Sequence, residues 1–283
     1  MVLGLAIAAS LSLGVADYLA GVALRRDGRT NAALTYTAVA FGVGLLLVVL
    51  AIPFASIDEF SAADVAWSVA AGAAFGLSLP LLMIGMARGP IAVVAPVLGL
   101  TSLAVPAIAG PLLGDRLSDL ELIGLLITFP AAAMIALDPH PTEYALTTGR
   151  AVALAVTAGG LLGSAAVFFG RTSTDSGIGP GVVAQLTGLL LLLGVGLLTG
   201  RIVRPKRGAA EAAVIVGLLT GFSVVLSVLA YQRGPVAIVA AVIGLAPGPT
   251  VALAWLLMKE RITVVQSGGF ALGVAAVILF AVG

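Results

Sequence analysis

The sequence predicts an all-α membrane protein with ten transmembrane helices, arranged as two inverted repeats of five. Three observations lead to this prediction. Of the 283 residues, 60% are hydrophobic and only 10% are charged, whereas about a quarter of an ordinary soluble domain is charged. Ten apolar stretches approach the roughly 20 residues that one helical crossing of a bilayer requires. The second half of the chain also repeats part of the first.

The ten stretches are separated by charged residues, Gly or Pro. Connections such as Gly114-Asp115-Arg116 are very short, so successive helices must be antiparallel neighbours. The first stretch starts at Met1 with no basic segment and no cleavage site, and we expect it to be retained as a helix. The spans are expected at 2–24, 32–54, 65–86, 91–113, 120–137, 151–169, 180–199, 212–231, 236–258 and 263–282.

The internal repeat appears when the sequence is shifted by 145 residues. Arg88-Gly89-Pro90 then aligns with Arg233-Gly234-Pro235, and 14 of the 39 positions from Ala87 to Leu125 are identical to their partners. Shared composition would give roughly a tenth, so the pattern indicates a duplication. Each half holds five spans, and an odd number makes the second half enter the membrane in the opposite direction. We predict a first repeat at 1–138, a linker at 139–150 and a second repeat at 151–283.

Equivalent residues of the repeat also predict how helices begin. Ser118 with Glu121, and Thr263 with Gln266, have the spacing of a capping box at the start of the fifth and tenth spans. The two Arg-Gly-Pro motifs are interpreted first as turns. Their prolines suit the first turn of a helix, and their arginines can compensate the carbonyl end of the preceding helix.

Basic residues are concentrated on one side of the predicted membrane protein. The connections after odd-numbered spans hold 11 Lys and Arg residues, and those after even-numbered spans hold 3. The positive-inside rule therefore places the first set in the cytoplasm and both termini outside. The cluster Arg201, Arg204, Lys206 and Arg207 is interpreted as a topology anchor that can touch anionic lipid.

Composition excludes several other functions. Lys and Arg number 14 against 13 acids, which leaves no basic field for nucleic acid. There is no cysteine, and the single histidine, His140, lies in the linker. A thiolate metal site and an intramembrane Ser-His pair are excluded on these counts, and no phosphate-binding Gly-Lys-Ser/Thr loop occurs. We expect no enzyme activity, no cofactor and no metal ion.

The pattern resembles the drug/metabolite transporter superfamily, and specifically its EamA-type ten-helix transporters. In each half a Gly-Pro turn precedes a long apolar helix, and an acid followed by Arg, Asp115-Arg116 or Glu260-Arg261, precedes a closing helix. The resemblance implies transport of small organic solutes, with export of amino acids, metabolites or drugs favoured, through a central cavity between the halves. Many relatives end in a basic cytoplasmic tail. This chain ends at Phe280-Ala281-Val282-Gly283, with no basic tail. The family orientation would place the C-terminus in the cytoplasm, whereas the arginine count places both termini outside. We follow the arginine count.

Asp17 is the one acidic residue well inside a predicted span, since the others lie at predicted boundaries or in loops. A lone carboxyl group within a membrane is costly and by default lines a polar cavity, titrates or pairs with a cation. One interpretation makes Asp17 a proton-coupling group. The other lets it reach an interface or pack against a neighbouring Arg or hydroxyl. Aligning Gly14 with Gly163 places Ala166 opposite Asp17, so an acid-dependent function would belong to the first half.

Helix-breaking residues provide the second pointer to a site. Prolines interrupt the fourth span, and Pro247-Gly248-Pro249 interrupts its counterpart, the ninth; paired broken helices mark binding sites in transporters. The alternative is a kink that only shapes packing. Polar residues of the spans complete the candidates, although Ser and Thr in membrane helices commonly bond to their own backbone. The candidates for substrate or proton pathway are Asp17, Tyr18, Tyr36, Ser78, Pro96, Thr101, Ser102, Gln185, Ser223, Ser227, Pro247, Pro249 and Thr250.

These observations predict a secondary active transporter in the cell (inner or plasma) membrane that works by alternating access, with coupling to protons as one interpretation. The expected partners are a small-molecule substrate, membrane lipid and protons, with the protein a monomer or homodimer. A facilitative uniporter or channel-like permease for sugars or ions is the alternative, although neither a filter-like loop nor a charged ring is evident. An intramembrane enzyme is a more remote alternative function. The few aromatic residues, 6% of the chain, favour small metabolites over large planar drugs.

Overall fold

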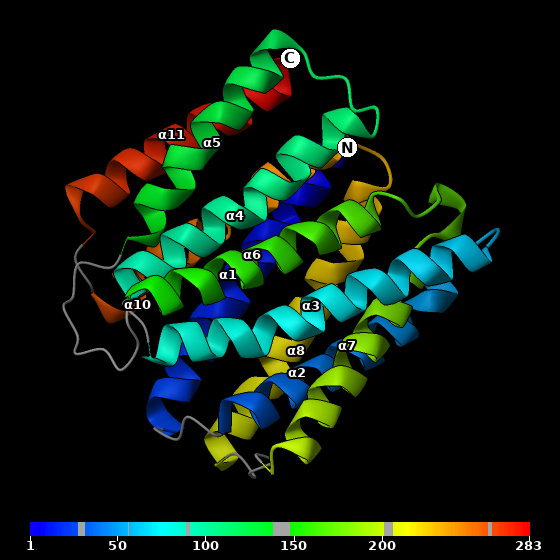
Figure 1. Ribbon diagram of the computed structural model, residues 1–283, viewed down its shortest axis with the longest axis vertical. Coiled ribbons are helices and arrows are strands. Elements are labelled where there is room, and N and C mark those ends of the chain that lie inside the picture. The colour runs from blue at the N-terminus through cyan, green and yellow to red at the C-terminus, as the bar shows by residue number, and fades with distance from the viewer. Residues whose placement is uncertain (28–31, 56, 89–90, 138–147, 201–205, 260–261) are drawn as a thin grey trace.

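A computed structural model describes residues 1–27, 32–55, 57–88, 91–137, 148–200, 206–259 and 262–283. The regular structure in these ranges is entirely helical (Figure 1). The predicted central linker, with His140, lies almost wholly outside the described residues. The helices are α1 (Val2–Asp27), α2 (Ala32–Ala51), α3 (Ala62–Arg88), α4 (Ile91–Leu112), α5 (Asp119–Ala136), α6 (Thr148–Phe169), α7 (Gly179–Leu198), α8 (Arg207–Tyr231), α9 (Val236–Ile243), α10 (Pro247–Met258) and α11 (Val264–Val282), with 3-10 turns at Ile52–Phe54 and Thr174–Ser176.

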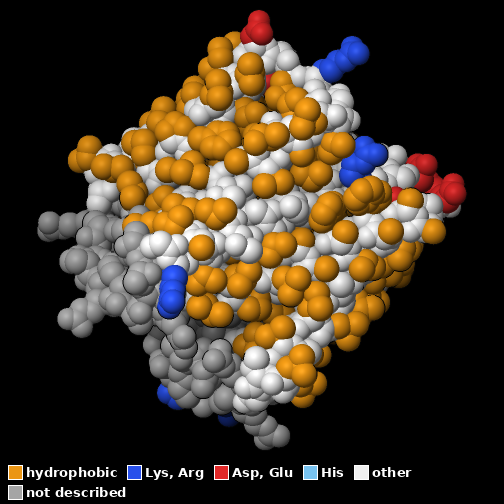
Figure 2. Space-filling model, in the orientation of Figure 1, with side chains coloured by type: hydrophobic (Ala, Val, Ile, Leu, Met, Phe, Trp, Pro, Cys, Tyr) orange, Lys and Arg blue, Asp and Glu red, His pale blue; other side chains and the backbone are white. Residues whose placement is uncertain are grey.

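The ten predicted spans are confirmed. Ten segments of the described chain are long and apolar enough to cross a membrane, with α9 and α10 together forming the ninth. Large hydrophobic side chains cover the outside of the bundle, and in Figure 2 the basic and acidic side chains lie towards its edges. On α7, for example, Leu190 is 59% exposed and Leu197 is 71% exposed. A surface this apolar belongs in lipid and not in water.

An even number of crossings places both termini on one side of the bundle, and Figure 1 shows them at the same end. We call this side the termini face; it also carries the connections α2–α3, α4–α5, α6–α7 and α8–α9. The opposite side, which receives the 11 basic residues counted above, is called the arginine face.

The predicted helix starts are largely confirmed. Capping boxes begin α5 at Ser118 and α11 at Thr263, where the backbone N–H of each cap residue donates to the side chain three residues later, at 2.7 and 3.0 Å. Arg233 donates to the carbonyl of Leu229, 3.1 Å away at the end of α8. One detail is wrong, because Pro235 is the N-cap of α9 and does not lie in its first turn. Of the first Arg-Gly-Pro motif, 89–90 lie outside the described residues.

Small residues allow close contact between the two halves in two equivalent helix pairs, α3 with α7 and α8 with α2. Gly72 on α3 lies against the backbone of Ala184 on α7, and Gly217 on α8 lies against that of Ala40 on α2. The same 145-residue shift relates Gly72 to Gly217. One turn further along, Gly76 meets Gly188 and Gly221 meets Gly44. Helices can approach this closely only where side chains are minimal.

The α5–α11 pair shows the same reciprocity. Gly124 of α5 packs on Ala276 and Phe280 of α11, and its repeat partner Gly269 packs on Ala131 and Ile135 of α5. The start of each helix therefore meets the end of the other, so the two equivalent helices run antiparallel; Figure 1 shows them side by side. The inverted repeat stays a prediction, and these reciprocal contacts support it.

Replacing Gly72 by Ala should destabilise the protein. The new Cβ atom would collide with the backbone of Ala184, which cannot move without shifting α7. Overpacking of this kind costs about 1–3 kcal/mol. Gly194→Ala on α7 is the matched control, because nothing lies within 4 Å of its new Cβ and a helical Gly→Ala exchange into open space stabilises by about 0.5–1 kcal/mol. Thermal unfolding of both variants in detergent tests the prediction, which fails if the two Tm values shift alike.

Candidate functional site

The ninth span is broken where the sequence predicts it. α9 ends at Ile243 and α10 begins at Pro247, with Gly244, Leu245 and Ala246 between them. Pro247 and Pro249 have no N–H to donate, so the i→i−4 ladder cannot continue through this segment. Turn hydrogen bonds replace it, including Ala246 N–H to the carbonyl of Ile243 at 3.0 Å.

The fourth span is not broken in the same way, which corrects one prediction. α4 runs as one helix from Ile91 to Leu112, with Pro96, Pro106 and Pro111 inside it. These prolines are five or more residues apart, so each removes one backbone hydrogen bond while its neighbours keep theirs. In the ninth span two prolines only two residues apart follow Gly244, and a whole turn is lost. The paired broken helices expected of both halves therefore occur in the second half alone.

The break is held against α1. Thr250 at the start of α10 donates its hydroxyl to the carbonyl of Gly14 at 2.9 Å and to that of Ala246 at 3.2 Å. Ser10, one turn before Gly14, lies 3.5 Å from the carbonyl of Ile243. A Cβ atom on Gly14 would come within 2.5 Å of the carbonyl oxygen of Ala246, so only Gly permits this contact. Thr250, Pro247 and Pro249 thus lie at the junction of α1 with the broken span, a contact that the sequence did not predict.

Asp17 lies one turn beyond this junction, on the side towards the arginine face. Residues 3, 6, 10, 13, 17 and 20 follow the 3-4-3 spacing of a single helix face. Along this face Ala6 and Ser10 are buried, and Leu3, which is partly exposed, packs against the core around α9. Leu13 and Ala20 are also partly exposed, and Asp17 is exposed. The described residues provide Asp17 with no hydrogen bond and no ion pair.

This exposed face of α1 does not point to lipid. The lipid-facing stripe is marked by Gly4, Ile7 and Leu11, which are exposed on another side of the helix. Asp17 instead continues the face on which Ala6 packs into the core around α9. Among the described residues, this face of α1 is therefore more accessible around Asp17 than at Ala6 and Ser10.

Side-chain exposure changes along α4 as it does along α1. Its face towards the ninth span contains Gly110, which lies against Ala237 of α9, and Leu103, which lies against Gly244 at the break. Continuing towards the arginine face, Gly99 and Pro96 on the same side are partly exposed, and nothing lies within 4 Å of a Cβ atom placed on Gly99. α9 packs on both α1 and α4, whereas the main partners of α10 are α1 and α5. α4 and α1 therefore both have accessible inner faces on the arginine side of the break.

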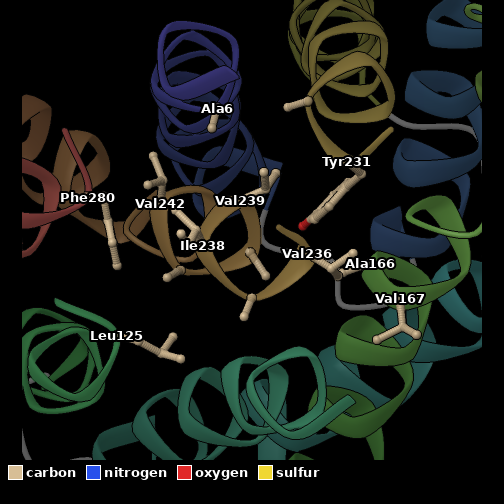
Figure 3. Close-up of a cluster of buried hydrophobic side chains, with 14 of the residues drawn as sticks. Ala6, Leu125, Ala166, Val167, Tyr231, Val236, Ile238, Val239, Val242 and Phe280 are labelled. Carbon is tan, nitrogen blue, oxygen red and sulfur yellow. The ribbon is translucent and has the colours of Figure 1, made fainter. Parts of the chain in front are cut away.

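The termini face is closed around α9. Every residue from Val236 to Val242 is at most 7% exposed. Figure 3 shows their side chains surrounded by Ala6 of α1, Ala166 and Val167 of α6, and Phe280 of α11. Ala166 is the residue that the repeat places opposite Asp17. It is 8% exposed and belongs to this closed core, while its acidic counterpart is exposed.

Two carboxylates that sequence reasoning did not assign to the site hold the termini face together. Asp115, in the α4–α5 turn, accepts a hydrogen bond from the backbone N–H of Ala237 at 3.3 Å and so ties that turn to the first turn of α9. Asp64 in α3 is 3% exposed and accepts hydrogen bonds from the hydroxyl of Ser61 at 2.6 Å and the backbone N–H of Ser173 at 2.7 Å. The only sequence signal for these two contacts was the position of each acid close to the start of a helix.

Several predicted hydroxyls have structural partners. Ser78, Thr101 and Ser102 each donate to a backbone carbonyl three or four residues earlier in their own helix, at 2.7 to 2.9 Å. Ser223 joins α8 to α1 by donating to the carbonyl of Ala9 at 2.9 Å. These bonds match the structural interpretation that the sequence left open for Ser and Thr.

Tyr36 and Gln185 differ from the hydroxyls. Each is 2% exposed, and neither the Tyr36 hydroxyl nor the Gln185 Nε2 has a hydrogen-bond partner among the described residues. Tyr36 packs in the cluster that contains Ala16 and Ala20 of α1, on either side of Asp17 in the chain. Gln185 lies against Gly44 where α2, α7 and α8 meet. Tyr18 and Ser227 are partly exposed. Tyr36 therefore packs on the stretch of α1 that contains Asp17, through its alanines.

Comparison with known proteins finds a family match for the second half of the chain and a shared fold for the whole chain. Residues 149–282 match the EamA-like transporter family. A solved structure described only as "Crystal structure of protein" superposes with a TM-score of 0.78 at 18% sequence identity, covering 99% of this chain and 96% of that chain. At this identity the likeness establishes the fold alone. No curated protein matches the chain.

Proposed function

We propose that this integral, multi-pass membrane protein is a secondary transporter for a small organic solute. Its ten membrane-spanning segments and the match of its second half to the EamA-like transporter family support this proposal. The solute would occupy the space between the accessible faces of α1, α4 and α10. The protein would reside in the cell membrane with the arginine face in the cytoplasm.

One observation carries this proposal. The same face of α1 is buried from Ala6 to Ser10 and accessible from Leu13 to Ala20. The change occurs at the level of the α9–α10 break, where backbone carbonyls and the hydroxyl of Thr250 meet. A site reached from one face and closed from the other is what alternating access requires of each end state. The closed core around α9 disfavours an open channel.

Proton coupling is part of the proposal and rests on Asp17. Its carboxyl group lies at membrane depth on the accessible face, without a partner among the described residues. A group in this position can exchange protons with water on the arginine side while the termini side is sealed. When the protein opens to the other face, the same group can exchange protons there, which couples proton movement to solute movement.

The proposal is tested with purified protein in liposomes that contain a pH-sensitive dye. Amino acids, sugars, nucleosides and cationic drugs are added in turn, and we expect one class to move protons together with labelled solute. Gly99→Trp should abolish that movement, because the indole would fill open space on the inner face of α4. Gly194→Trp is the matched control, since it also has open space but lies on the lipid-facing stripe of Leu190 and Leu197. Solute flux that Gly99→Trp leaves at the wild-type rate would contradict the proposed pathway.

A further inference from the structure

An open groove lies between α3 and α6 on the arginine side of the protein. Its volume is about 360 Å³, and it is lined by Leu81 of α3 and by Arg150, Ala153, Leu154 and Thr157 of α6. The four α6 residues follow the spacing i, i+3, i+4 and i+7, so they form one stripe about 10 Å long. Arg150 marks its outer end, and the rest is predominantly apolar.

The groove begins where the packing of the two helices loosens. Towards the termini face α3 and α6 are joined by stacked rings, with 5.8 Å between the ring centroids of Trp67 and Phe168. Towards the arginine face the contact passes to Leu81, which directly follows Pro80 within α3. The ring stack is replaced there by smaller side chains, Ala153 and Leu154, which leave space between the helices.

The groove faces the membrane and not the interior site. Val156, beside Ala153 and Thr157 on α6, is 45% exposed. The repeat pairs Ala153 with Gly4, which lies on the lipid-facing stripe of α1. A hollow on the membrane-spanning surface is filled by lipid chains, because an empty space would leave its lining without contacts. The question is therefore which lipid occupies it.

The charge of Arg150 indicates which kind of lipid occupies the groove. Arg150 lies in the first turn of α6, is exposed, and forms no ion pair or hydrogen bond with another residue in the described part of the chain. Arg207 on the same face, by contrast, pairs with Glu211 at 3.2 Å. The alignment of Gly14 with Gly163 places Met1 opposite Arg150, so the fold does not require a base at this position. A guanidinium group can bind two phosphate oxygens at once.

We propose that this groove binds one anionic phospholipid from the leaflet on the arginine face. Its phosphate is held by Arg150, and one acyl chain lies along Ala153, Leu154 and Leu81. Thr157 already donates its hydroxyl to the carbonyl of Ala153 at 2.8 Å. Its hydrogen-bond donor is therefore satisfied without a polar ligand in the groove. The order of the residues, with the charge at the surface and the apolar lining deeper, matches the order of headgroup and chain in a lipid.

Native mass spectrometry of the full-length protein tests this proposal, with phosphatidylglycerol and phosphatidylcholine as probes. The wild type should retain phosphatidylglycerol more tightly. Arg150→Gln should weaken phosphatidylglycerol binding about tenfold, the value expected for one charged hydrogen-bonded contact. It should weaken phosphatidylcholine binding much less, because the cationic choline neutralises the charge of that lipid's phosphate. Thr157→Trp, which fills the groove, should weaken both. Arg207→Gln is the control on the same face, and because Arg207 already pairs with Glu211, it should weaken phosphatidylglycerol binding much less than Arg150→Gln does.

Two results would overturn the proposal. One is unchanged phosphatidylglycerol binding by Arg150→Gln. The other is an equal loss in Arg150→Gln and Arg207→Gln, which would mean diffuse attraction to the whole face. Inorganic phosphate added in excess distinguishes a lipid site from a free phosphate site, because phosphate alone should not displace the lipid. None of these readouts depends on transport, so they stand apart from the flux assay.

Discussion

Asp17→Asn should remove proton-coupled solute movement while leaving a folded protein. Asparagine has nearly the shape of the carboxyl group but cannot bind and release a proton at neutral pH. Asp17 forms no hydrogen bond or ion pair among the described residues, so the exchange removes no structural contact. We expect the dye signal to fall at least about tenfold, the usual contribution of a required proton-transfer group being about 100-fold or more, with little change in Tm.

Two other acids serve as comparisons for Asp17. Asp175→Asn replaces an exposed acid in the α6–α7 connection and should leave both flux and Tm unchanged. Asp64→Asn should lower Tm, because it weakens an acceptor buried among Ser61 and Ser173. Labelled solute that still moves in Asp17→Asn, without the dye signal, would support a pure coupling role. Wild-type proton movement in Asp17→Asn would return the residue to a structural role.

Cysteines introduced one at a time along a single face of α1 should differ in how fast they react with a charged thiol reagent. The chain contains no native cysteine, so each introduced thiol is the only one present. In vesicles, a charged thiol reagent should modify Leu13→Cys and Ala20→Cys when it is added on the arginine side. Ala6→Cys should be protected from both sides, with a rate at least about tenfold lower, because reaction there requires the closed core to open.

Ile7→Cys separates exposure to water from exposure to lipid. Ile7 is 36% exposed on the lipid-facing stripe, and a charged reagent should not reach it through lipid. Adding Asp115→Asn to Ala6→Cys should increase its labelling from the termini side, since the α4–α5 turn then holds α9 less tightly. Labelling of Ala20→Cys from the termini side alone would show that we have assigned the open and closed faces incorrectly.

Local signals explain why so much of the fold could be predicted. The number of spans follows from the length of apolar runs between breaks, and the start of α5 follows from Ser118 and Glu121, three residues apart. The Pro247-Gly248-Pro249 break needs only the missing N–H groups of two prolines. Each of these features depends on residues within one or two helical turns, so a single sequence contains the whole signal.

Long-range contacts explain the errors and omissions. The sequence treated Pro96 and Pro247 alike, but α4 remains one helix and the ninth span does not. Asp115 contacts a backbone group 122 residues away. The groove beside Arg150 depends on where α3 and α6 separate. No periodicity or spacing reports which distant helix lies beside a given residue.

The sequence by itself determined that this is a ten-helix membrane protein of two related halves, with one acid well inside a span and helix-breaking residues in the fourth and ninth spans. These properties come from hydrophobicity, turn chemistry and internal repetition, which act over short distances. Only the tertiary structure decided that Asp17 is exposed while Ala166, its counterpart, is buried, and that the described residues close the termini face around α9. A helix face is buried or open according to the helix packed against it, and that partner comes from the other half of the chain.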